Sequence, residues 1–82
     1  MNKERALHVL KQGMNTEFWG LRFYRRVVAR TTSEDGKRVF RSLVEEEQRH
    51  LDVLRGQYAA ISGQSKWVTL EEARALADSV DP

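Results

Sequence analysis

Apolar residues recur at helical spacing through most of the chain. From about residue 4 to residue 30 they alternate at intervals of three and four, which places them along one face of a helix. The same periodicity runs from about residue 34 to residue 61. The segment TTSEDG between the two runs is rich in turn and cap residues, and either Thr32 or Ser33 can cap the second helix. The pattern therefore predicts two long helices joined by a tight turn.

A third, shorter helix is predicted near the C-terminus. Thr69-x-x-Glu72 has the form of a capping box, and it opens a helix to about residue 79. The linker at 62–68 contains Trp67, which we expect to anchor it against the helices. The prediction is one all-α domain over residues 1–82: an antiparallel helical hairpin at about 4–61 with a short C-terminal helix. The apolar face of that helix is predicted to be Leu70, Ala73, Leu76 or Ala77, and Val80.

A hairpin of two helices leaves one side of its apolar stripe uncovered. The chain has only 82 residues and no cysteine, so disulfides are excluded as a support and metal binding or self-association remains. We therefore expect two copies to pair into a four-helix bundle. Four apolar residues lie off the main stripe and form either a second contact face or ordinary flank packing: Phe18, Trp19, Phe23 and Val27.

Charge and composition exclude several classes of function. The net charge of +2 is too small to imply a nucleic-acid partner, although basic residues concentrate at positions 22–41, a pattern typical of a solvated face. No apolar run is long enough to span a bilayer, and no signal-peptide pattern opens the chain, so a cytoplasmic protein is expected. No triad or phosphate-binding glycine motif is present, and His8 is expected to be exposed without a special role.

Three polar residues interrupt the apolar stripes. Glu17 falls between apolar positions of the first helix, and Glu47 and His50 fall between those of the second. An unpaired buried carboxylate is costly, so such a group normally acquires a cation or a proton. With the turn centred near Thr32, both glutamates lie fifteen residues away, about 22 Å along the hairpin at the same level. We therefore expect all three side chains to converge.

Carboxylate and imidazole ligands suit iron or manganese, and the same mixture can hold zinc. A twofold axis would bring four carboxylates and two imidazoles together at the interface between two chains. The alternative is a non-catalytic helical oligomerisation module in which Glu47 and His50 face a partner or pair with arginine. Structural metal binding, typically of zinc, is another.

The residues also resemble a known family. The run EFWGLRFYRRVVARTTSEDGKRVFRSLVEEEQRHLDVLRGQY is similar to the first helical hairpin of rubrerythrin-like members of the ferritin-like superfamily, and the similarity covers residues 6–61, about two-thirds of the chain. The second hairpin of that family and the cysteines of rubrerythrins are missing. A half-length chain with this spacing looks more like the encapsulated ferritins, or like one half of a longer protein. The matching positions are Glu17 with Tyr24, Phe40, Leu43, and Glu47-x-x-His50.

The resemblance implies a ferritin-like four-helix bundle with a di-iron site shared by two chains. Glu17 would be the ligand from the first helix, Glu47 a bridging or terminal ligand, and His50 the imidazole ligand. Tyr24 would lie near the site, where it hydrogen-bonds a carboxylate or assists redox steps, or it is simply a core aromatic. The implied function is oxidation of Fe(II), for iron storage or detoxification. Higher-order rings and an encapsulating shell protein are the implied partners.

Overall fold

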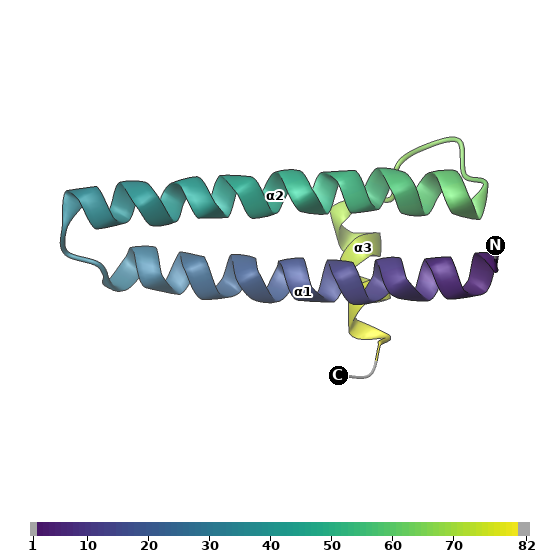
Figure 1. Ribbon diagram of the computed structural model, residues 1–82, viewed down its shortest axis with the longest axis horizontal. Coiled ribbons are helices and arrows are strands. Elements are labelled where there is room, and N and C mark those ends of the chain that lie inside the picture. Colours follow the sequence, from purple (N-terminus) through teal and green to yellow (C-terminus); the bar gives the residue numbers. More distant parts are fainter. Residues whose placement is uncertain (1, 81–82) are drawn as a thin grey trace.

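Three helices make up the computed structural model, which describes residues 2–80 (Figure 1). Helix α1 spans Lys3–Arg30, α2 spans Glu34–Ser62, and α3 spans Leu70–Asp78. The predicted all-α hairpin with a short C-terminal helix is confirmed, with helix ends within one residue of those expected. Among residues 2–80 no helix is long and apolar enough to cross a membrane.

Each helix begins at a polar residue whose side chain accepts a backbone hydrogen bond. Asn2 caps α1, Ser33 accepts from the Gly36 N–H at 3.2 Å to cap α2, and Thr69 accepts from the Glu72 N–H at 3.1 Å to cap α3. The Glu72 carboxylate in turn accepts from the Thr69 N–H at 3.0 Å, which completes the predicted capping box. These bonds satisfy N–H groups that a helix start leaves without partners.

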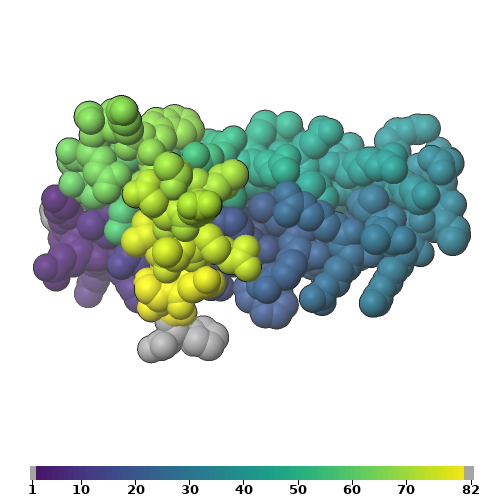
Figure 2. All heavy atoms as spheres, turned by 180° about the vertical axis from the view of Figure 1, so that it is seen from behind, coloured from purple at the N-terminus to yellow at the C-terminus, as the bar shows by residue number. Residues whose placement is uncertain are grey.

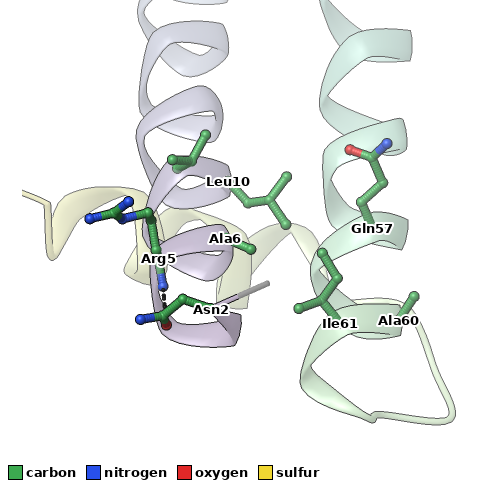
Figure 3. Close-up of a pocket in the computed structure, with 8 residues that line it drawn as sticks. Asn2, Arg5, Ala6, Leu10, Gln57, Ala60 and Ile61 are labelled. Atoms are coloured by element: carbon green, nitrogen blue, oxygen red, sulfur yellow. Dashed lines mark hydrogen bonds between the residues drawn. The ribbon is translucent and has the colours of Figure 1, made fainter.

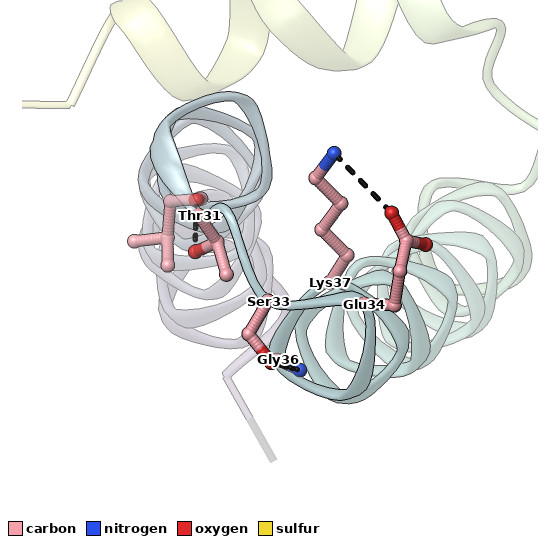
Figure 4. A network of polar contacts seen from close by, with 6 residues as sticks. Thr31, Ser33, Glu34, Gly36 and Lys37 are labelled. Carbon is pink, nitrogen blue, oxygen red and sulfur yellow. Dashed lines mark hydrogen bonds and ion pairs between the residues drawn. The ribbon is translucent and has the colours of Figure 1, made fainter.

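The turn between α1 and α2 is short and held by local contacts (Figure 4). The Thr31 hydroxyl donates to the Val27 carbonyl at 2.6 Å at the end of α1, and Lys37 pairs with Glu34 at 3.8 Å in the first turn of α2. Of the two predicted caps, Ser33 is the one used. A tight turn sets the register of the two helices, because it leaves little freedom to slide one along the other.

Helix α3 crosses one face of the hairpin and leaves the other face uncovered. Figure 1 looks onto the uncovered face with α3 behind the hairpin, and Figure 2 shows α3 in front when the molecule is turned around. The Asn15 amide donates to the Ala77 carbonyl at 3.1 Å, and the Arg55 guanidinium donates to the Val68 carbonyl at 2.7 Å. These bonds tie α3 and its preceding linker to both long helices.

The core lies where the hairpin and α3 meet, and this corrects two predicted details. The apolar stripe predicted for the second helix runs through Leu43, Leu54 and Ile61. Leu51 lies outside it, yet it is 2% exposed because it is on the side of α2 that α3 covers. Helix α3 docks through Ala73 and Ala77, whereas Leu70 is exposed. Small residues allow this short helix to approach the hairpin closely. The buried core consists of Met14, Leu21, Leu51, Tyr58, Ala59, Val68, Ala73 and Ala77.

The uncovered side of the hairpin, called the open face below, carries exposed apolar residues. Val53 lies two residues from both Leu51 and Arg55, hence about 160° around α2 from the side that meets α3. Val9, Val39 and Val53 are all more than half exposed. Near the chain's N-terminal end this face holds an apolar groove of about 680 Å³ (Figure 3). Its lining includes Ala6, Val9, Leu10, Ala60 and Ile61.

Candidate metal centre

Glu17 of α1 and Glu47 and His50 of α2 meet near the middle of the hairpin. Each offers one ligand atom, and the three atoms lie within 4.8 Å of one another. The His50 Nδ1 atom is 3.6 Å from Glu17 Oε2 and 3.9 Å from Glu47 Oε1. The expectation that two glutamates equally distant from the turn would meet at one level is therefore confirmed.

The two carboxylates are largely shielded from water, but the imidazole is not. The side chains of Glu17 and Glu47 are 18% and 20% exposed, whereas that of His50 is 56% exposed. His50 lies at the edge of the open face. The helical repeat explains the exposure of His50, because Leu51, four residues after Glu47, is the residue that the helix rotates into the core.

One oxygen of the cluster lacks a hydrogen bond. Glu17 Oε2 is buried and accepts no hydrogen bond from any residue that the structure describes. Its nearest basic atom, His50 Nδ1, is at 3.6 Å, which is beyond hydrogen-bonding distance. A buried acceptor left without a partner destabilises a fold, and more so when it carries charge. The metal-free arrangement therefore leaves one strong oxygen ligand unsatisfied.

Gly20 makes room for the Glu47 carboxylate. A Cβ atom built on Gly20 would be 3.2 Å from Glu47 Oε2 and 3.4 Å from its carboxyl carbon. The first distance is shorter than an ordinary van der Waals contact, so a side chain at this position would shift the carboxylate by a few tenths of an ångström. Gly20 follows Glu17 by three residues and hence lies on the same side of α1. The signal for this contact in the sequence is a glycine one turn after a candidate ligand.

The donor set fits a divalent transition metal. Two ligand atoms that bind one ion at about 2.0–2.3 Å are at most about 4.6 Å apart, so the observed spread requires only a small side-chain adjustment. Two carboxylates with one imidazole suit iron and manganese and are compatible with zinc. Three donors do not fill six coordination positions, so this chain alone would leave positions for further ligands.

Tyr24 lies closer to the turn than the cluster does. Its ring packs against Phe40 of α2, with centroids 6.2 Å apart, and against Phe23 at 5.4 Å. Its hydroxyl makes no hydrogen bond to Glu17 or Glu47 within residues 2–80. In this structure Tyr24 therefore acts as a packing aromatic between the hairpin helices.

The remaining singled-out residues divide between packing and exposure. His8 is exposed, as expected. Trp67 lies against α2, where a Cβ on Gly56 would be 2.8 Å from its ring, so it does anchor the linker. Phe18 packs against the core, whereas Trp19 and Phe23 remain exposed. The four residues off the main stripe are therefore not a single contact face.

Comparison of this chain with family models, with curated proteins and with solved structures finds no match. The resemblance to the ferritin-like superfamily therefore stays a prediction from the spacing of Glu17, Tyr24, Glu47 and His50.

Proposed function

We propose that this chain is a half-length, ferritin-like di-iron carboxylate protein that oxidises Fe(II). Two copies would pair through their open faces into a four-helix bundle. Glu17, Glu47 and His50 of each copy would supply the ligands, giving four carboxylates and two imidazoles at the shared centre. Iron storage or detoxification is the role that this chemistry serves.

The unsatisfied oxygen of Glu17 is the observation that carries the proposal. An apolar side chain would suit this position better if it only served packing, because the stripe around it is otherwise apolar. A carboxylate kept there, beside a second carboxylate and an imidazole, is favourable once a cation binds between them. The three donors come from two helices whose register is set by a tight turn, so their convergence does not require a flexible loop.

The position of the cluster supports pairing of two copies. The open face surrounds the cluster with exposed valines at Val9, Val39 and Val53, so a second copy docked there would bury apolar surface on both sides. Because the cluster lies near the midpoint of both long helices, a twofold axis through it would bring the two clusters together. It would also cover the exposed edge of His50.

In this reaction the protein's own side chains would bind the iron, orient it and shield it from water. The carboxylates would favour the more highly charged Fe(III) state, and the imidazoles would fix geometry. Bound iron supplies one-electron transfer to dioxygen or peroxide, with Fe(II) entering as substrate and Fe(III) as product. The buried side chains of Leu21 and Leu51 lie one residue beyond Gly20 and His50 and close the α3 side of the centre to water.

Native mass spectrometry with and without Fe(II) tests the proposal. We expect a dimer or a multiple of it that takes up two iron ions per pair of chains, with near-ultraviolet absorption of ferric iron appearing on exposure to air. Glu47→Gln and His50→Gln should each abolish uptake. Glu45→Gln removes an exposed carboxylate two residues from Glu47 and should leave uptake unchanged.

The other outcomes separate the alternatives. A folded oligomer that binds no metal would refute the proposal and leave a helical oligomerisation module. Binding of zinc or manganese in preference to iron, without oxidation of Fe(II), would indicate a structural metal site formed by the same residues.

A further inference from the structure

A row of arginine and aromatic side chains runs along the outer side of α1. Trp19, Arg22, Phe23, Arg26 and Arg30 follow one another at intervals of one to four residues and are all exposed. We call these five residues the arginine–aromatic stripe. Trp19 and Phe23 are 63% and 58% exposed, which is high for large aromatic side chains. None of the five residues belongs to the buried core, to the residues packed against it or to the metal cluster.

The arginines of the stripe are unfavourable for the helix by themselves. Arg22, Arg26 and Arg30 are spaced at i, i+4 and i+8, where like charges destabilise a helix. Within residues 2–80 none of the three forms an ion pair. The surrounding segment 22–41 holds seven basic residues and two acidic ones, Glu34 and Asp35, both of which pair within α2. The positive charge of the stripe is therefore not compensated within the fold.

The geometry of the stripe favours a carboxylate-bearing partner. The Arg22 guanidinium lies over the Trp19 ring, 5.2 Å from its centroid. A guanidinium stacked in this way keeps its N–H edge free, and that edge matches the two oxygens of a carboxylate. Next to it is a hollow of about 330 Å³, large enough to receive an apolar side chain and lined by Phe23, Arg26, Val27, Arg30 and Thr31.

We propose that the arginine–aromatic stripe docks an acidic, amphipathic segment of another protein. Carboxylates of that segment would pair with Arg22, Arg26 and Arg30, and an apolar side chain would enter the hollow beside Phe23. Aromatic residues and arginine are the types most enriched where protein interfaces carry their binding energy. The argument uses no part of the metal centre and is independent of its function.

Two other occupants are less favoured by the same observations. Bases of a single-stranded nucleic acid need free aromatic faces for stacking, and Arg22 already covers a face of Trp19. A second copy of this chain would have to supply free carboxylates. The exposed acids that form no ion pair or capping hydrogen bond among the described residues are spread over all three helices and do not make one acidic segment: Glu4, Glu45, Glu46 and Glu71.

The test is a fluorescence titration of the full chain carrying Trp67→Phe, which leaves Trp19 as the reporter. The probe is a short synthetic peptide with glutamate and leucine at helical spacing, and its control has glutamine in place of every glutamate. We expect the acidic peptide to shift Trp19 emission, and its affinity to fall as salt is added. Arg22→Gln, Arg26→Gln and Arg30→Gln combined should weaken binding about tenfold or more.

A matched variant removes equal charge elsewhere. Lys3→Gln, Arg49→Gln and Lys66→Gln change three exposed basic residues outside the stripe and should alter affinity less than the stripe variant does. Equal binding of the glutamine peptide, or equal losses in the two triple variants, would overturn the proposal. So would tighter binding of oligothymidylate or of phosphatidylglycerol vesicles than of the acidic peptide. A change of oligomeric state in the stripe variant would also overturn it, because it would assign the stripe to self-assembly.

Discussion

Replacing Glu17 by methionine should stabilise the metal-free protein while removing its metal affinity. Methionine has a similar length and no charge, so it can occupy the same space between the helices without an oxygen that lacks a partner. If the carboxylate is retained for metal binding and not for folding, the fold without metal should improve when it is lost. Stability and function are thereby predicted to change in opposite directions at one residue.

The size of the effect follows from the environment of the side chain. An unsatisfied buried polar group costs about 1–3 kcal/mol. The Glu17 side chain is 18% exposed, so water relieves part of that cost and the lower part of the range applies. We therefore expect Glu17→Met to raise the free energy of unfolding by about 1–2 kcal/mol. For a chain of this size, each kcal/mol of added stability raises Tm by about 4–8 °C.

The assay is urea denaturation in EDTA, followed by helical circular dichroism at one fixed protein concentration because pairing would contribute to stability. Glu45→Met is the control, since Glu45 is exposed and its replacement should change stability little. A loss of stability in Glu17→Met would refute the reasoning, because it would mean that the carboxylate already has adequate partners without metal.

Two further predictions concern the glycine beside the cluster and the cap of α3. Gly20→Ala should raise helix stability by up to about 1 kcal/mol yet weaken Fe(II) uptake, because its Cβ would push on the Glu47 carboxylate at 3.2 Å. The control is Gly13→Ala, whose Cβ would meet only the methyl groups of Leu54, at 3.3 and 3.6 Å, and which should leave uptake unchanged in the same mass spectrometry titration. Hydrogen bonds from the Thr69 backbone and side chain hold the pKa of Glu72 below its ordinary value, so its contribution to stability is complete above the unfolded-state pKa and is lost as pH falls through the folded-state pKa. Urea titrations across that acidic range should show this loss. Thr69→Ala should reduce this acid-induced loss and lower the free energy of unfolding by about 1 kcal/mol at neutral pH. An unchanged acid dependence in this variant would contradict the role given to Glu72.

The helices and their caps could be read from the sequence because their causes are local. Helical periodicity depends on residues three and four apart, and the caps at Ser33 and Thr69 depend on bonds to residues three positions later. The meeting of Glu17 with Glu47 followed from the same local information, since a tight turn and a constant rise per residue determine which positions are level. Which of the two candidate caps the second helix uses was settled only by the turn itself.

The sequence by itself thus determined the three helices, the register of the hairpin and the convergence of two carboxylates with an imidazole. Only the tertiary structure decided which side of the hairpin α3 covers, and therefore that Leu51 is buried while His50 lies at an exposed edge. It also decided that Leu70, which the sequence places on the apolar face of α3, stays exposed. The physical reason is that a helix with apolar residues on both flanks of its stripe has two nearly equivalent ways to be covered. The choice between them depends on contacts between segments far apart in the chain, such as Asn15 with Ala77, which no local pattern encodes.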